Sequence, residues 1–199
     1  MTAISRYEKR GRPRSFDIDE AVTTAEQLFR EKGYEGVGVA EIGKALGITP
    51  PSFYAAFGSK LGLFERVIAH YEAGDARFFP DALATEGPAT AAIARLLDEA
   101  AEAYAARPGQ AGCLVLDGTR GSGDAGALAL TRARREAAEA AVRERIARDL
   151  PDRADRLAPM VMIALRGLST SSADGVARED LRAFALAAAR MIAQEAERQ

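Results

Sequence analysis

Apolar residues recur at helical spacing along most of this chain, and no stretch alternates in the way a half-buried strand does. Glycine or proline separates one helical segment from the next. With 199 residues the chain is long enough to bury a sizeable core. The pattern therefore predicts an all-α protein of about nine helices with no sheet.

Composition excludes several kinds of functional site. The chain has one histidine, His70, and one cysteine, Cys113, so neither a disulfide nor a Cys/His zinc site can form within one chain. Neither residue lies in a catalytic motif, and we predict no catalytic residue, metal site or cofactor. No apolar run is long enough to cross a membrane, and no apolar segment follows the basic N-terminus as in a signal peptide. We therefore expect a cytoplasmic protein without a membrane partner.

Positive charge is concentrated at the start of the chain. Residues 1–14 contain Glu8 as their single acid against five basic residues, Arg6, Lys9, Arg10, Arg12 and Arg14. The whole chain has a net charge of −2. A basic arm on an acidic body is typical of a protein that binds a polyanion at one place. We interpret residues 1–14 as a flexible basic arm.

Two short helical segments on either side of Gly47 form a helix-turn-helix pattern. The first spans residues 39–46, and the second spans about residues 50–57, between Thr49 and Gly58. Thr49 suits the N-cap, and Pro50 and Pro51 are tolerated in a first turn. A longer helix from residue 18, ended by Gly33, precedes this pair, and another begins after Ser59 in a unit that Pro80 closes. Such a unit places its second short helix in the major groove of DNA.

The exposed side of that second short helix would present small hydroxyl or apolar groups and one phenol. Such groups suit phosphate oxygens and thymine methyls. Lys60 begins the next helix and could meet a phosphate together with free backbone N–H groups, while the basic arm could enter a neighbouring minor groove. The predicted DNA-binding residues are Thr49, Pro51, Ser52, Tyr54, Lys60, Arg12 and Arg14.

The order of residues in this region resembles the DNA-binding domain of the TetR/AcrR family of transcriptional regulators. The resemblance covers about residues 11–72 and rests on GRPR at 11–14, AEQLFREKGY at 25–34, IGKALGI at 42–48, SFYAAFGSK at 52–60 and LF at 63–64. It implies a repressor with a DNA-binding domain at 15–60 and an effector-binding and dimerisation domain at 61–199. Thr49, Ser52, Tyr54 and Lys60 match positions that usually touch DNA. Gly38 replaces the hydroxyl residue common at its position, so one phosphate contact is lost there.

The remaining residues predict helices near 88–107, 127–150, 153–171 and 178–197. The last two have apolar faces with small residues, which favour a homodimer that reads a pseudo-palindromic operator on double-stranded DNA. The predicted interface residues are Leu157, Val161, Ala164, Leu168, Leu181, Ala185, Ala188 and Ile192. A small effector would bind within this domain and release DNA, and the few charges on the helix faces predict an apolar or aromatic molecule. Its predicted contacts are Leu96, Leu97, Ala100, Tyr104, Cys113 and Leu116.

Two other interpretations compete with this one. Residues 121–126 spell the G-x-G-x-x-G pattern of nucleotide-binding turns, so an enzyme that binds a nucleotide is an alternative. We favour a flexible turn, because no second strand follows to complete a βαβ unit. A helical protein whose basic arm binds nucleic acid without specificity is the other alternative. Cys113 lies among apolar residues and is either a buried inert thiol, which we favour, or a sensor of oxidants or electrophiles.

Overall fold

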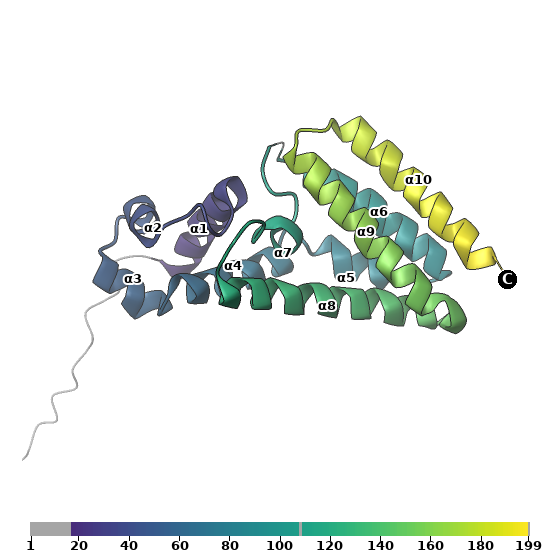
Figure 1. Cartoon of the computed structure of the whole chain (residues 1–199), viewed down its shortest axis with the longest axis horizontal. Helices are drawn as coiled ribbons and strands as arrows, with labels where there is room; N and C mark the ends of the chain where they lie inside the picture. The colour runs from purple at the N-terminus through teal and green to yellow at the C-terminus, as the bar shows by residue number, and fades with distance from the viewer. Residues whose placement is uncertain (1–16, 108, 199) are drawn as a thin grey trace, which may run out of the picture.

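The computed structural model describes residues 17–107 and 109–198. Within these residues the chain forms ten α-helices and one 3₁₀ turn, and none is in a strand, which confirms the all-α prediction. Figure 1 shows a small head, α1 to α3, at one end, and a larger body, α5 to α10, joined to the head by α4. None of the helices described here combines the length and apolar composition that crossing a membrane requires.

Local signals set the ends of the head helices, α1 (Ile18–Lys32), α2 (Val39–Leu46) and α3 (Pro50–Phe57). Asp17 caps α1 by accepting the backbone N–H of Asp19 at 2.7 Å. Gly47 takes the left-handed conformation, φ +64°, that the tight turn between α2 and α3 requires. Ser59 caps α4 (Lys60–Ala73) by accepting the N–H of Gly62 at 2.9 Å. The predicted helix-turn-helix pattern is therefore confirmed.

An aromatic cluster holds the head to α4. The rings of Phe29, Tyr34 and Phe64 lie within 4.9–5.8 Å of one another, centroid to centroid. Ile42 and Phe53 are fully buried and fix α2 and α3 against the same core. Because Phe64 belongs to α4, the first turns of this helix complete the core of the head. Helix α4 therefore crosses the boundary that the sequence placed after residue 60.

The body contains α5 (Phe78–Leu83), α6 (Ala89–Ala105), α7 (Leu114–Asp117), α8 (Ala125–Ala147), α9 (Ala154–Ala173) and α10 (Arg178–Glu197), with the 3₁₀ turn Pro151–Arg153 before α9. Helix α6 packs against α9 and α10, and α8 runs along the base of the body (Figure 1). The sequence missed α5, whose third residue is Pro80. Proline is tolerated in a first turn because its missing N–H would have no intrahelical partner there.

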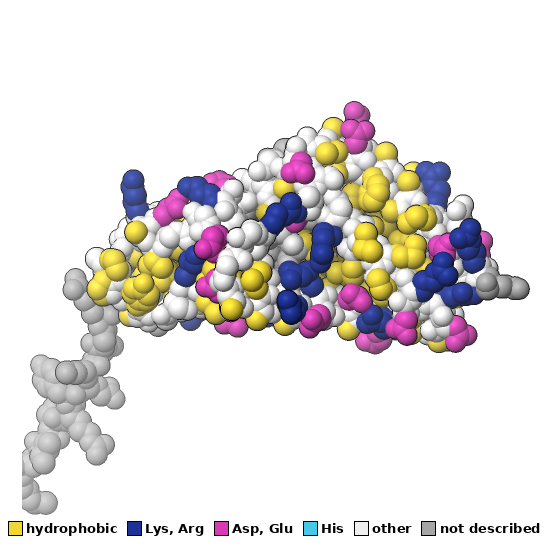
Figure 2. Space-filling model, in the orientation of Figure 1, with side chains coloured by type: hydrophobic (Ala, Val, Ile, Leu, Met, Phe, Trp, Pro, Cys, Tyr) yellow, Lys and Arg dark blue, Asp and Glu magenta, His cyan; other side chains and the backbone are white. Residues whose placement is uncertain are grey.

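The predicted interface residues of α9 and α10 do not face outward. Each of the eight, Leu157, Val161, Ala164, Leu168, Leu181, Ala185, Ala188 and Ile192, is at most 4% exposed. They pack inside their own protomer, so assigning them to a partner was wrong. The outward side of these helices carries other apolar residues, with Ile163 71%, Phe184 49% and Met191 48% exposed. Figure 2 shows apolar side chains gathered over α9 and α10.

The glycine-rich segment 121–126 connects the body to the head. It follows the short helix α7 rather than a strand, so the described residues do not form the βαβ unit that a nucleotide site of this type needs. The hydroxyl of Ser122 donates to Glu35 at 2.7 Å, and that of Tyr34 donates to Asp124 at 3.2 Å. Asp124 also caps α8 by accepting the N–H of Ala127 at 2.8 Å. The segment therefore fixes the start of α8 against the loop after α1.

Candidate functional site

Helix α3 presents an uncharged, exposed surface at the end of the head. Phe53 and Phe57 point into the core, whereas Tyr54 is 52% exposed. Thr49, the N-cap, and Pro51 are exposed, and Ser52 is half-buried. The hydroxyl oxygens of Thr49 and Ser52 lie 3.1 Å apart and share a hydrogen bond. Four of the predicted DNA-binding residues therefore lie together on one accessible surface.

Lys60 lies beside this surface but is occupied within the head. Its ammonium donates to the carbonyl oxygens of Tyr34 at 3.1 Å and Val37 at 3.2 Å, and it lies 4.0 Å from the centroid of the Tyr34 ring. Of its three N–H donors, one remains for a phosphate. Lys60 thus holds the loop between α1 and α2 in place, and its contact with DNA stays a prediction.

Another lysine of the head was not selected from the sequence. Lys44 is exposed in the last turn of α2, and no described carboxylate lies within the 4.0 Å of an ion pair. A free ammonium beside the recognition helix suits a phosphate contact. Arg12 and Arg14, the predicted minor-groove residues, lie outside the described residues.

A cavity of about 310 Å³ lies in the body between α4, α5, α8 and α9. Three predicted effector contacts, Tyr104, Cys113 and Leu116, line it. The other three, Leu96, Leu97 and Ala100, do not, because they are fully buried in the core around α6. The sequence missed most of the lining, including Tyr71, Phe78, Phe79, Met162 and Leu165.

The cavity also has charged groups, contrary to the expectation from the helix faces. Glu72, Arg134 and Arg135 line it together with the apolar residues. Arg134 pairs with Glu72 at 3.5 Å, and burial raises the pKa of Glu72 while Arg134 lowers it. Arg135 donates to the carbonyl oxygen of Val115 at 3.0 Å. These positions on α4 and α8 are far apart in sequence, so periodicity alone could not bring them together.

Cys113 lies at the cavity wall and is 6% exposed. Burial raises the pKa of its thiol, and hydrogen bonds with Tyr71 and Tyr104 offset only part of that rise. Its backbone N–H donates to the Ser169 hydroxyl at 2.8 Å, which ties the residue to α9. A buried, protonated thiol has the properties of the inert residue favoured from the sequence.

We expect alkylation of Cys113 by iodoacetamide at pH 8 to be at least about 10-fold slower in the native protein than in urea, because the thiolate is the reacting species. The raised pKa moves the onset of the native reaction to higher pH. Because Cys113 is the single cysteine of the chain, the mass shift reports this residue alone. Equal rates in native and unfolded protein would instead support the sensor interpretation.

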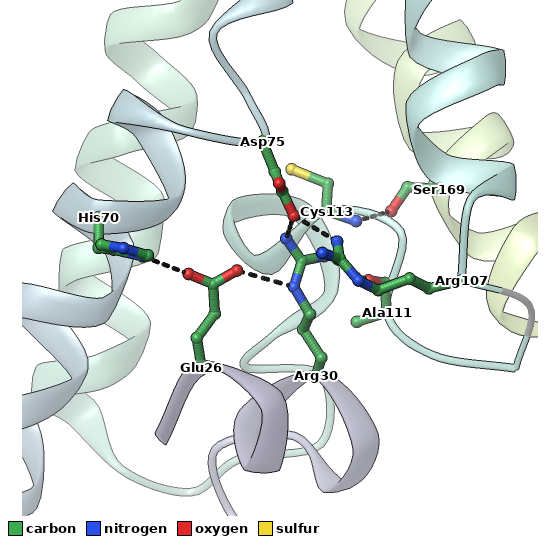
Figure 3. Close-up of polar contacts among 8 residues, drawn as sticks. All are labelled: Glu26, Arg30, His70, Asp75, Arg107, Ala111, Cys113 and Ser169. Atoms are coloured by element: carbon green, nitrogen blue, oxygen red, sulfur yellow. Dashed lines mark hydrogen bonds and ion pairs between the residues drawn. The ribbon is translucent and has the colours of Figure 1, made fainter. Parts of the chain in front are cut away.

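A buried polar network connects the head to the wall of the cavity (Figure 3). Arg30 of α1 is 4% exposed and donates to Glu26 at 3.0 Å and to Asp75, in the turn after α4, at 2.7 Å. Its guanidinium also lies 4.8 Å from the ring centroid of Tyr71, which lines the cavity. The same Asp75 accepts from Arg107, and Nδ1 of the partly exposed His70 lies 2.8 Å from Glu26.

The network continues into the segment that leads to Cys113. The backbone N–H of Ala111 donates to the carbonyl oxygen of Arg30 at 3.0 Å. Arg30 therefore contacts the turn after α4, an aromatic ring of the cavity and the chain two residues before Cys113. No sequence signal indicated this, because Asp75, Tyr71 and Ala111 are distant from Arg30 in sequence. The nearby Glu26 and Arg30 by themselves are typical of the solvated face of a helix.

This chain is similar to known proteins in both sequence and structure. Residues 21–67 match the family model for bacterial regulatory proteins of the tetR family. The chain is 40% identical over 182 residues to the HTH-type transcriptional repressor BdcR of Escherichia coli strain K12, covering 92% of each chain. It is 30% identical to the repressor ComR of the same strain, over 89% of this chain and 90% of that one. A solved structure of a cysteine mutant of the TetR family regulator CifR, complexed with 26-bp double-strand operator DNA, is similar with a TM-score of 0.80 and 35% identity, over 90% of this chain and 98% of that one.

Proposed function

Because this chain belongs to the TetR family of DNA-binding transcriptional regulators, we propose that it is a homodimeric repressor that a small molecule releases from its operator. The names of BdcR and ComR, both repressors, support the direction of regulation. The observation that carries the proposal is the exposed surface of α3 on a rigid helix-turn-helix head. The cavity in the body supports the response to a ligand.

We infer that α3 enters the major groove with Thr49, Pro51, Ser52 and Tyr54 toward the DNA. Helix α3 carries no charged residue, so phosphate attraction has to come from its surroundings. Exposed Lys44 supplies positive charge beside α3. Arg12 and Arg14, which lie outside the described residues, stay predicted contacts of the adjacent minor groove. Hydroxyl and apolar groups on α3 would then contribute the contacts that discriminate between sequences.

A homodimer is supported by the outward side of α9 and α10. We define the α9–α10 face as Met160, Ile163, Gly167, Phe184, Ala187 and Met191. Phe184 and Met191 are seven residues apart, so they lie two turns apart on one side of α10. Several large exposed apolar side chains on neighbouring helices, here Ile163, Phe184 and Met191, mark protein contacts. A two-fold pairing of this face would present two heads to two half-sites of a pseudo-palindrome.

We infer that a ligand in the cavity would act on the head through the network around Arg30. A ligand that contacts Tyr71 would act on a ring that stacks with the Arg30 guanidinium. Since Arg30 belongs to α1, a shift of α4 or of its following turn changes how the head is held. Such coupling works only if the ligand binds the two head positions with different affinity.

Binding to DNA upstream of the protein's own gene tests the proposal, with scrambled duplex as the control. Fluorescence anisotropy at several salt concentrations should give a preference of about 10³-fold or more for the upstream DNA. Equal and steeply salt-dependent binding to both duplexes would favour the non-specific nucleic-acid-binding protein. Binding of a nucleotide without any binding of DNA would favour the enzyme.

Replacing Tyr54 with alanine should lower affinity for the upstream DNA by about 10-fold, as expected for loss of one good contact to a base or phosphate. The free energy of unfolding should change by less than about 1 kcal/mol, because such an exposed side chain contributes little to the core. Val176→Ala truncates an apolar side chain that is 41% exposed in the turn between α9 and α10, outside the head, and is the control. Unchanged affinity in Tyr54→Ala would remove α3 from the proposed interface.

A further inference from the structure

The charged residues that line the cavity include one more positive charge than negative charge. Two arginines and one glutamate line it. Glu72 is already paired with Arg134. Arg135 has no carboxylate within the 4.0 Å limit of an ion pair anywhere in residues 17–107 and 109–198. Its single hydrogen bond to a protein atom in this part of the chain goes to the Val115 carbonyl oxygen, which leaves most of its five N–H donors available.

The surroundings of Arg135 make this unmatched charge unfavourable. Burial, Arg166 and Arg132 lower the pKa of Arg135, in that order of size, while Cys113 and Glu136 raise it, and the guanidinium stays protonated. The net effect of these surroundings disfavours the positive charge of Arg135. An anion in the cavity would relieve the repulsion and give the guanidinium a bidentate partner.

Further donors line the same cavity. Tyr71 and Tyr104 are 2% and 4% exposed, and both line the cavity. Burial, with the Cys113 thiol, raises the pKa of both phenols well above the usual range, so both hydroxyls remain protonated donors. Both phenols lie close enough to the Cys113 thiol, a weak acceptor, for it to act on their pKa. Two buried hydroxyls beside a weak acceptor favour a ligand oxygen.

From this arrangement we propose that the effector is a small monocarboxylate whose carboxylate binds Arg135 and the tyrosine hydroxyls and whose apolar body lies along Phe78, Phe79, Met162 and Leu165. One unmatched guanidinium fits one negative charge. A cavity of about 310 Å³ holds roughly ten non-hydrogen atoms at the volume of liquid water. This ligand class replaces the uncharged apolar or aromatic molecule expected from the helix faces. It rests on the proposed function in so far as the cavity is the effector site.

Calorimetry on the full chain without DNA tests the ligand class. The probes are octanoate and 3-phenylpropanoate, each compared with its own amide, which keeps the shape and removes the charge. We expect each carboxylate to bind at least about 10-fold more tightly than its amide, as for a charged pair in a partly buried site. Equal affinity of acid and amide, tighter binding of the amide, or no binding of either carboxylate would overturn the proposal.

Two arginine variants locate the contact. Arg135→Gln should weaken octanoate binding by at least about 10-fold, whereas Arg148→Gln, at an exposed residue that caps the same helix outside the cavity, should change it by less than about 3-fold. Equal losses in the two variants would show a general effect of charge and overturn the assignment to Arg135. The comparison of acid with amide on the unaltered protein needs no variant, so a folding defect cannot obscure the result.

The two measurements distinguish a wrong ligand class from a wrong proposed function. Carboxylate binding is measured without DNA, and operator binding is measured without ligand. If octanoate binds through Arg135 but does not change operator affinity, the ligand class stands and release by this ligand is wrong. If the protein binds its operator but neither carboxylate, the regulator stands and the ligand class is wrong.

Discussion

Replacing Arg30 with methionine is expected to lower the free energy of unfolding by about 3 kcal/mol, because the buried Glu26 carboxylate loses its guanidinium partner and retains the His70 imidazole. The Arg30 and Glu26 side chains are 4% and 9% exposed, so water does not replace the lost ion pair. Asp75 is 41% exposed and keeps Arg107, so most of the loss comes from Glu26. Urea unfolding followed by circular dichroism measures the change.

Two variants separate the burial of Arg30 from its charge. Arg107→Met removes the other guanidinium on Asp75, but Arg107 is exposed, and the expected loss is below about 1 kcal/mol. Combining Arg30→Met with Glu26→Gln should recover more than half of the free energy of unfolding that Arg30→Met loses, since the buried carboxylate is then also gone. A loss in Arg30→Met no larger than that in Arg107→Met would contradict the role of Arg30 as the centre of the network.

The head was predictable because its signals are local. Asp17, Gly47 and Ser59 each set a helix end through atoms within four residues in the chain. Figure 1 accordingly places α1 to α3 where the spacing predicted them. The sequence analysis missed helix α5 because it treated Pro80 as the end of a helical unit. Pro80 instead lies in the first turn of α5, where proline is tolerated.

The body was less predictable because periodicity shows that a helix face is buried but not what buries it. The apolar faces of α9 and α10 were assigned to a partner, yet Val161 and Ala185 pack within their own protomer. The cavity likewise depends on which helices meet. Tyr71 and Arg135 lie on α4 and α8, and no spacing in the sequence links them. The Arg30 network has the same origin, since Asp75 is 45 residues away along the chain.

Replacing Phe184 with glutamate is expected to convert the proposed dimer into monomers and to lower operator affinity by roughly 100-fold or more, because two linked heads bind far more tightly than one. In a two-fold interface each substitution occurs twice, so two unmatched carboxylates would enter an apolar contact. Phe184 is 49% exposed in the protomer, so the fold of the single chain should tolerate the change. Sedimentation velocity measures the mass, and anisotropy measures operator binding.

The control is Leu128→Glu, which adds the same charge at an apolar residue of α8 that is 37% exposed and outside the α9–α10 face. It should leave the protein dimeric. Ala185→Glu makes the opposite comparison, because Ala185 is 1% exposed and a carboxylate there should unfold the protomer rather than dissociate a dimer. A Phe184→Glu protein that stays dimeric, with unchanged operator affinity, would place the interface elsewhere. Dissociation in Phe184→Glu alone would assign the outward side of α10 to the partner and its inward side to the core.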